Sequence, residues 1–188
     1  MLLKEIEKAL KQRSQIRFFN APDYMWLGNG EAWYPVEDLP FLEAEELYYI
    51  LNIPEDKRGK FTIEAASSKL DIFRDNDDAE ELPGRVFYDM TIKDTIYRPM
   101  KTSTGIIFVD VSYLRPFKKT DYEIRIRLNE NGNPYIAIKE GMFLKGIIVP
   151  VTKVDEKFVS DLYELADLSA VRVDNSEQQD SLFDGENN

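Results

Sequence analysis

At the centre of the N-terminal region stand the residues Trp26-Leu27-Gly28-Asn29-Gly30-Glu31-Ala32-Trp33. Asn-Gly is the favoured pair for a two-residue hairpin turn, because both central positions of that turn need a positive φ. With the turn at Asn29-Gly30, Gly28 faces Glu31 and Trp26 lies directly opposite Trp33. A tryptophan pair across two strands would brace such a hairpin. The segment therefore predicts an antiparallel pair of strands early in the chain.

Two amphipathic segments flank this hairpin. In residues 2–13, apolar residues recur at helical spacing among charged ones. Residues 42–51 predict a second helix, with acidic side chains near its start, where the helix dipole favours them, and with Pro54 beyond its end. The N-terminal region therefore predicts a helix–hairpin–helix arrangement, and a strand is expected at residues 61–65.

From residue 86 onward the pattern changes to strands separated by turns. Ile106–Val109 is apolar at both parities, which is typical of a strand covered on both faces. Asp155 suits the N-cap of a last helix over residues 155–168. The fold class we expect is α+β, with a mainly antiparallel sheet of about six strands in residues 86–149, an N-terminal helix–hairpin–helix region and a C-terminal helix. The candidate strands are 86–92, 95–101, 105–111, 122–128, 134–139 and 143–149.

Two registers compete for the hairpin that follows Leu128. A two-residue turn at Asn131-Gly132 would put the isoleucines of the two strands on opposite faces. A three-residue loop pairs Leu128 with Ile136 and Ile126 with Ile138, which gathers the apolar side chains on one side. Because register follows the buried face, we expect the three-residue loop.

The composition excludes several kinds of active site. The chain of 188 residues contains no cysteine and no histidine, which excludes disulfide frameworks, zinc–thiolate sites, cysteine nucleophiles and serine–histidine triads. Asp75-Asn76-Asp77 begins like a calcium loop, but Ala79 stands where a ligand is needed and Glu80 replaces the required glycine. We therefore expect no cofactor, no metal site and no catalytic residues.

The chain divides into two parts by composition. Residues 1–168 predict a single α+β domain, with a candidate sub-domain break in the acidic loop 75–84. Residues 169–188 hold too little apolar surface to offset the cost of ordering, so we expect a disordered acidic tail. The N-terminus lacks the apolar core of a signal peptide, and the apolar runs are too short to cross a bilayer. We expect a cytoplasmic protein with no membrane partner.

Charge is unevenly distributed along a chain whose net charge is −11. Residues 86–153 carry 11 basic and 7 acidic side chains, whereas residues 154–188 carry 2 basic and 10 acidic ones. Basic side chains interleaved with tyrosines are typical of surfaces that contact phosphates. The alternative is a solvated sheet face that the chain's own acidic groups neutralise. The candidate anion- or nucleic-acid-binding residues, here called the basic face, are Arg98, Lys101, Arg115, Lys118, Lys119, Arg125, Arg127 and Lys139.

The tail contains the pentapeptide Gln179-Asp180-Ser181-Leu182-Phe183. Leu182 and Phe183 are adjacent, large and apolar in a polar segment, which suits insertion into a groove of a partner. The pentapeptide resembles the motif with which bacterial replication and repair proteins bind the β sliding clamp: glutamine, a variable residue, serine or aspartate, leucine and phenylalanine. The resemblance implies that the leucine and phenylalanine fill an apolar cleft of the clamp and that the amide of Gln179 makes hydrogen bonds at its edge.

Two segments of the body carry a second resemblance. They are Trp26-Leu27-Gly28-Asn29-Gly30-Glu31-Ala32-Trp33-Tyr34-Pro35 and Thr102-Ser103-Thr104-Gly105-Ile106-Ile107-Phe108-Val109. With them the body resembles uncharacterised accessory proteins of prophages and mobile elements in Gram-positive bacteria. This resemblance implies a role in mobile-element replication or counter-defence and supplies no site residues.

These observations lead to one expected function and two alternatives. We expect a non-enzymatic adaptor or modulator that its tail recruits to the sliding clamp, with a body that contacts DNA or a second replication protein. The first alternative is an acidic protein inhibitor or nucleic-acid mimic that acts through its folded surface. The second is a metal-dependent nuclease that uses carboxylates alone. Its two candidate acid–x–lysine triplets, Glu55-Asp56-Lys57 and Asp155-Glu156-Lys157, occur about as often as chance predicts.

Overall fold

The computed structural model describes residues 3–21, 24–37, 39, 41–66, 80–85, 88–117, 121–129, 131–151, 155, 157–162, 164, 165 and 168. The helices among them are α1 (Leu3–Leu10), α2 (Ala44–Ile50), α3 (Glu55–Arg58) and the 3₁₀ helix η3 (Val111–Phe117). Residues 157–162, 164, 165 and 168 are also helical. The strands are β1 (Gln15–Asn20), β2 (Met25–Gly28), β3 (Ala32–Val36), β4 (Thr62–Ala65), β5 (Gly84–Arg85), β6 (Met90–Ile92), β7 (Thr95–Thr102), β8 (Gly105–Asp110), β9 (Glu123–Leu128), β10 (Pro134–Glu140) and β11 (Phe143–Ile148).

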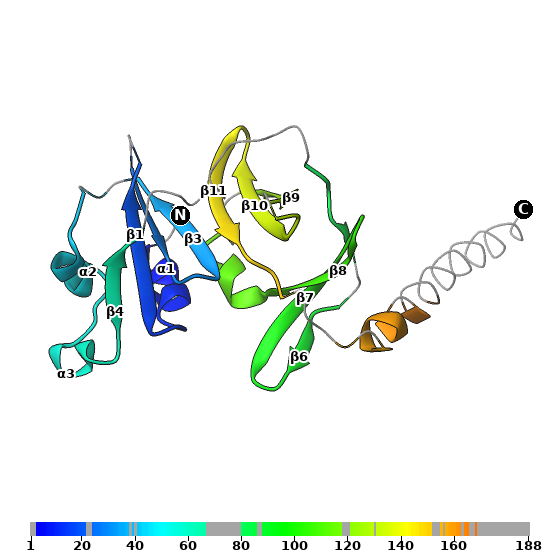
Figure 1. Ribbon diagram of the computed structural model, residues 1–188, viewed down its shortest axis with the longest axis horizontal. Helices are drawn as coiled ribbons and strands as arrows, with labels where there is room; N and C mark the ends of the chain where they lie inside the picture. Colours follow the sequence, from blue (N-terminus) through cyan, green and yellow to red (C-terminus); the bar gives the residue numbers. More distant parts are fainter. Residues whose placement is uncertain are drawn as a thin grey trace, which may run out of the picture.

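The strands form two sheets, and the predicted α+β class is confirmed (Figure 1). The larger sheet has seven strands in the order β4-β1-β2-β3-β11-β10-β9. Its neighbouring strands are antiparallel except for β1 and β4, which run parallel. In the second sheet, of four strands, β7 pairs with β5, β6 and β8. The two sheets therefore mix early and late parts of the chain.

The prediction of one C-terminal sheet is wrong, although its strands are nearly right. The expected six strands correspond closely to β6–β11, but β9–β11 join the N-terminal strands through the pairing of Ile147 with Trp33. The helix–hairpin–helix prediction also missed β1, which turns the hairpin into a three-stranded unit. Local patterning predicts a strand but not its partner, because the partner is chosen by packing between distant parts of the chain.

The N-terminal hairpin closes one residue later than predicted. Gly28 faces Trp33 and Trp26 faces Pro35, so Gly30, with a φ of +88°, and Glu31 form the turn. Asn29 does not serve as a turn residue, because its side chain is buried and its Oδ1 accepts hydrogen bonds from the backbone N–H groups of residues 31 and 32 at 3.1 and 3.0 Å.

The two tryptophans consequently do not oppose each other, yet they remain on the same face. The ring of Phe19 stacks on Trp26, with centroids 6.2 Å apart, and meets Trp33 edge-on at 6.1 Å. The indole of Trp33 also covers Gly28, where a Cβ atom would lie only 2.2 Å from the ring. The hairpin is thus braced by the contacts of Phe19 with both tryptophans and by the packing of Trp33 on Gly28, instead of by direct pairing of the tryptophans.

In the hairpin between β9 and β10, the apolar side chains share one face as predicted, but the residues that face each other across the strands differ from the predicted pairs. Ile126 faces Ile136 and Ile124 faces Ile138, whereas the prediction paired Ile126 with Ile138. The N–H of Asn129 donates to the carbonyl of residue 133 at 2.9 Å. A shift of two residues preserves the alternation of side chains, so the isoleucines of both strands still share one face.

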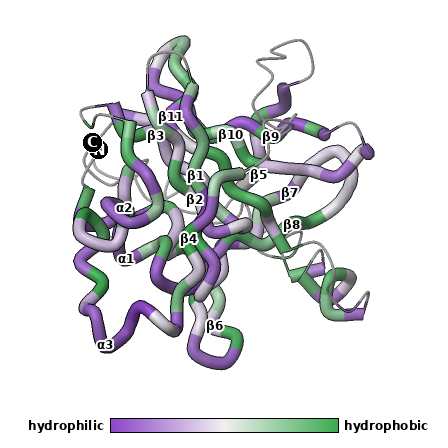
Figure 2. The backbone as a smooth tube through the Cα atoms, turned by 60° about the vertical axis from the view of Figure 1, so that its left-hand side comes forward, coloured by the Kyte–Doolittle hydropathy of each residue, from purple (hydrophilic) through white to green (hydrophobic). Residues whose placement is uncertain are grey.

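Apolar side chains cover both faces of the larger sheet. The main core lies on one face, where α1, α2 and η3 pack with the inner side chains of β7 and β8. A second cluster, on the opposite face, contains Trp26, Trp33, Tyr135, Ala137 and Ile147. The apolar residues follow the central strands, whereas α3 is strongly hydrophilic (Figure 2). Both faces are buried because the strands are apolar at both parities in their middle.

The last helical segment packs on the outer face of β8. Asp155 is its N-cap, as predicted: Oδ1 accepts hydrogen bonds from the N–H groups of residues 157 and 158 at 2.9 and 3.1 Å. Phe158 stacks on Phe108 with ring centroids 6.0 Å apart, and Leu162 is buried beside them. Ile106–Val109 is therefore covered on both sides, which confirms the prediction for that strand.

Two short backbone bridges join the sheets. Glu81 pairs with Ile126 of β9, with hydrogen bonds of 3.0 and 2.9 Å. Phe108 of β8 pairs with Val151, with hydrogen bonds of 3.1 and 2.8 Å. The bridges thus tie the segment before β5 to β9 and the segment after β11 to β8.

Candidate functional site

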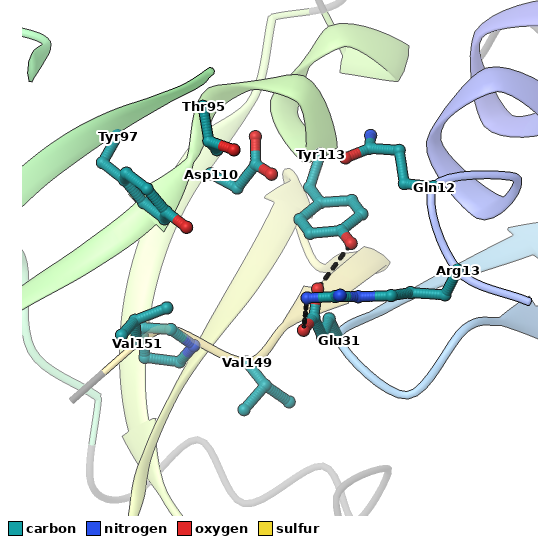
Figure 3. A pocket seen from close by; sticks show the side chains of 10 residues that line it. Gln12, Arg13, Glu31, Thr95, Tyr97, Asp110, Tyr113, Val149 and Val151 are labelled. Atoms are coloured by element: carbon teal, nitrogen blue, oxygen red, sulfur yellow. Dashed lines mark hydrogen bonds and ion pairs between the residues drawn. The ribbon is translucent and has the colours of Figure 1, made fainter. Parts of the chain in front are cut away.

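A polar cavity of about 280 Å³ opens between the β2–β3 turn of the larger sheet and the strands β7 and β8 of the second sheet (Figure 3). The turn after α1, the β2–β3 turn, the start of β7, the end of β8, η3 and the segment after β11 each contribute side chains to it. The backbone supports this junction, because the N–H of Val149 donates to the carbonyl of Glu31 at 2.7 Å. The lining residues are Gln12, Arg13, Glu31, Thr95, Tyr97, Asp110, Tyr113, Val149, Pro150 and Val151.

One wall of the cavity is a hydrogen-bonded group centred on Glu31. The guanidinium of Arg13 pairs with Oε1 of Glu31, and the hydroxyl of Tyr113 donates to Oε2 at 2.6 Å. Behind them, Nδ2 of Asn29 donates to the hydroxyl of Tyr113 and to the carbonyl of Ala9, both at 3.2 Å. The positive charge of Arg13 is thus already matched by a carboxylate of the same wall.

The protonation of this wall is set by burial. Burial, together with the hydrogen bond to Glu31, raises the pKa of Tyr113 well above its ordinary value of 10.0. Burial likewise raises the pKa of Tyr34, whose hydroxyl donates to the backbone carbonyl of Tyr113 at 2.9 Å. The hydrogen bond with Glu31 raises the pKa of Arg13. At neutral pH both phenols are therefore protonated, and Tyr113 acts as the donor to Glu31.

A second part of the lining is the carboxylate of Asp110. Its Oδ1 accepts from the backbone N–H of Ser112 at 2.8 Å and from the Ser112 hydroxyl at 2.5 Å. The side-chain amide of Gln12 donates to the same hydroxyl at 2.7 Å. These bonds fix the orientation of Asp110 at the end of β8 and direct it to the cavity (Figure 3).

A smaller cavity of about 140 Å³ adjoins the first and shares part of its lining. Gln12, Thr95 and Asp110 line both cavities. The smaller one adds the exposed carboxylate of Asp94 and the exposed guanidinium of Arg115. The carboxylate of Asp110 is thus shared by the two cavities.

The structure distributes the basic face over several elements instead of gathering it. Arg98 and Lys101 lie on β7, Arg115 lies in η3, and Arg125, Arg127 and Lys139 lie on β9 and β10. Lys118 and Lys119 lie outside the described residues. A common surface is found only for the last group, since the β9–β10 register places Arg125, Arg127 and Lys139 on one side of the larger sheet within the described chain.

The guanidinium groups of the basic face largely pair with acidic groups of the same chain. Arg98 holds Asp89 with two hydrogen bonds, at 2.8 and 3.0 Å, and this contact lowers the pKa of Asp89. Arg125 pairs with Glu123. The charge that remains for a polyanion is therefore smaller than the sequence suggests.

Arg127 and Lys139 are deeply buried and share Glu80. Only 2% of Arg127 and 8% of Lys139 is exposed. Nε of Arg127 donates to Glu80 at 2.6 Å, and Nζ of Lys139 lies 3.4 Å from both carboxylate oxygens. These two cations serve the packing of residue 80 against β9 and β10, and they are not accessible to a phosphate.

Other predicted features fall on residues that the structure does not describe or that make simple local contacts. The clamp-like pentapeptide, Gln179, Asp180, Ser181, Leu182 and Phe183, and the calcium-like run 75–79 lie outside the described residues. Glu55-Asp56-Lys57 belongs to the exposed helix α3, and Asp155 is a helix cap. Within the described ranges, the acidic side chains form no group of three or more that is suited to a metal ion. No helix there is long and apolar enough to cross a membrane.

Sequence reasoning missed the cavity because its polar residues come from six separate segments. Arg13, Glu31, Asp110 and Tyr113 are unremarkable when each is considered in its own stretch of sequence. A weak signal existed, since Asp110 directly follows the apolar run Ile106–Val109 and Glu31 occupies a turn between two buried strands. Polar residues at strand ends are frequent, however, so that signal becomes useful only when the sheet pairings are known.

In the comparisons with known proteins, no family model, no curated protein and no solved structure matches this chain.

Proposed function

We propose that the protein is a non-enzymatic adaptor or modulator that its tail recruits to the bacterial sliding clamp. The observation that carries this proposal is the pentapeptide at residues 179–183, in which Gln179, Ser181, Leu182 and Phe183 occupy all four restricted positions of the clamp-binding motif. A prophage or mobile element as the source of the protein accords with the resemblance of the body, and DNA or a second replication protein is the proposed target of the body.

The charges of the body support attachment through the tail and not through the surface of the body. Arg98, Arg125 and Arg127 are paired with carboxylates of their own chain. With a net charge of −11, the whole protein is repelled by a polyanion at long range. Attachment through a short apolar motif avoids this repulsion, because it depends on burying Leu182 and Phe183 in a groove of a partner protein.

Binding to a purified bacterial clamp, measured by surface plasmon resonance on the full-length chain, tests the proposal. We expect the Leu182→Ala, Phe183→Ala double variant to bind at least tenfold more weakly, because each truncation removes a buried apolar anchor. Equal binding of the wild type and the double variant would rule out the proposal.

The two adjacent glutamines provide a matched control. Gln179 belongs to the motif and Gln178 does not, although both occupy the same acidic tail. We expect Gln179→Ala to weaken clamp binding and Gln178→Ala to leave it unchanged. Equal losses in the two variants would indicate a general effect of tail composition and would contradict motif-based recruitment.

The second candidate is an inhibitor that acts through its folded acidic surface. It is favoured by the net charge of −11, because 35 acidic side chains exceed 24 basic ones even when every basic group is counted as paired. Deletion of residues 174–188 separates the two candidates. Clamp binding should be lost on deletion if the tail is the attachment site, whereas activity that survives deletion would favour the folded surface.

A further inference from the structure

The larger cavity, which is lined by Glu31, Asp110 and Tyr113, has the chemistry of a site for a cation. Arg13 and Glu31 neutralise each other in one wall, so the carboxylate of Asp110 leaves the lining of the larger cavity with a net negative charge. Glu31 is already engaged by Arg13 and Tyr113, whereas Asp110 accepts its hydrogen bonds from other described residues through Oδ1 alone, from Ser112. Among the described residues, Oδ2 of Asp110 accepts no hydrogen bond.

The remaining polar atoms of the lining are rich in acceptors. The amide nitrogen of Gln12 donates to Ser112, which leaves its carbonyl oxygen as an acceptor. In the described part of the chain, the hydroxyls of Thr95 and Tyr97 make no hydrogen bond, and that of Tyr97 points into the cavity (Figure 3). The hydroxyls can either donate or accept, whereas the carboxylate of Asp110 can only accept. A ligand that pairs with Asp110 must therefore be a good donor with a positive charge.

The size and the walls of the cavity indicate which kind of cation fits it. At about 280 Å³ it is smaller than most sites for drug-sized ligands, which span about 300–1,000 Å³. Tyr97 and Tyr113 provide aromatic walls, and Val149 and Val151 provide an apolar one. A planar guanidinium suits such a lining better than an ammonium, because it presents several N–H donors in a fixed plane and stacks on aromatic rings.

We propose that this cavity binds a guanidinium group, with Asp110 as its charge partner and the Tyr97 hydroxyl as a second acceptor. The group comes either from a free guanidino compound or from an arginine side chain of a partner protein. The inference does not depend on the clamp proposal, since the cavity and the tail are separate parts of the chain and can be tested separately.

Titration of the ¹⁵N-labelled full-length protein with blocked arginine, N-acetylarginine amide, tests the site by NMR. We expect saturable shifts at Asp110, Tyr113 and Gln12. The neutral analogue N-acetylcitrulline amide has nearly the same shape and should bind at least tenfold more weakly. Equal binding of the two compounds, or no saturable shift with either, would overturn the proposal. Shifts at this site with inorganic phosphate in place of the arginine derivative would also overturn it.

Matched variants connect the binding to the named atoms. Asp110→Asn keeps an oxygen for the bonds from Ser112 and removes the charge, so the fold should persist while binding falls at least tenfold. Tyr97→Phe should weaken binding about threefold, and Asp56→Asn, on the exposed helix α3, should leave it unchanged. Unaltered affinity in Asp110→Asn would contradict the assignment.

A second titration distinguishes the two sources of the group. A blocked pentapeptide with one central arginine between glycines carries the same guanidinium within a polypeptide. Binding of the peptide at least tenfold tighter than that of the blocked amino acid assigns the site to a protein partner. Equal binding assigns it to a free guanidino compound.

Discussion

At Gly28 the backbone of β2 passes directly beneath the indole ring of Trp33. A Cβ atom at this position would approach the ring to 2.2 Å, closer than carbon atoms can pack. We expect Gly28→Ala to lower the free energy of unfolding by about 2 kcal/mol or more, because the ring that the new methyl group would meet is buried. Urea denaturation followed by tryptophan fluorescence measures the change.

Gly59 offers the matched control for that substitution. Its φ of −60° suits any residue, and no atom lies within 4 Å of the place of a Cβ atom. Gly59→Ala should be neutral or slightly stabilising. A similar loss of stability in both variants would show that the contact with Trp33 is not the cause.

The phenols of Tyr113 and Tyr34 predict a loss of stability at alkaline pH. Burial raises the pKa of each above 10, which is close to the value of tyrosine in an unfolded chain. Above about pH 10 the unfolded state releases these protons and the folded state retains them. The stabilisation is therefore complete below pH 10 and decreases as the pH rises above it.

Tyr113→Phe should reduce this pH dependence. At pH 7 the variant should be less stable by about 1 kcal/mol, because the hydrogen bonds to Glu31 and Asn29 are lost. Between pH 9 and pH 11 its stability should fall less steeply than that of the wild type. Tyr88→Phe, at an exposed position, serves as the control. An unchanged slope in Tyr113→Phe would contradict the assignment of the shifted pKa to this residue.

Asn29 shows why a favourable local signal misplaced the turn. Asn-Gly predicts a turn from backbone preferences alone. In the folded chain the amide of Asn29 makes four hydrogen bonds, two to the backbone of its own turn and two to distant parts of the chain, Ala9 and Tyr113. Those distant partners are not visible in a local window of sequence, so the register could not be predicted from it.

At the scale of single elements, the last helical segment is held by one cap and a small apolar contact. Asp155 accepts hydrogen bonds from the N–H groups of residues 157 and 158, and Phe158 and Leu162 contact β8. Asp155→Ala should cost the segment about 1 kcal/mol. Amides of residues 158–162 should then exchange with solvent about fivefold faster, as measured by hydrogen exchange with mass spectrometry. Asp161→Ala, at an exposed position of the same segment, should have no such effect.

The elements themselves could largely be predicted from the sequence. Strands β7–β11 begin and end close to the predicted bounds, because alternating apolar residues and turn residues are local properties. The strand β1 was missed, since its alternation in Ile16 and Phe18 is short and adjoins the aromatic hairpin. The cavity was not predicted at all, because it exists only where the ends of distant elements meet.

At the scale of the whole molecule, Glu80 holds the second sheet to the first. Its carboxylate pairs with the buried side chains of Arg127 and Lys139, and the next residue bridges to β9. We expect Glu80→Gln to lower the free energy of unfolding by about 3 kcal/mol, because it leaves buried cations without this carboxylate. Thermal and urea denaturation measure the effect.

The surface pair of Arg125 and Glu123 provides the comparison. Glu123→Gln removes an equivalent charge from a more exposed ion pair on the same strand, and it should cost less than about 0.5 kcal/mol. Equal effects of the two substitutions would mean that burial of the Glu80 contacts does not matter for stability.

The two bridges also bear on how this protein avoids aggregation. An open strand can recruit a strand from another molecule, and such additions can continue into fibrils. Glu81 occupies the free side of β9 near its middle, and Val151 does the same for β8. Among the strands described, the terminal strand β4 of the larger sheet has only four residues. At these edges of the described strands, a neighbouring molecule therefore finds short or interrupted templates for strand addition.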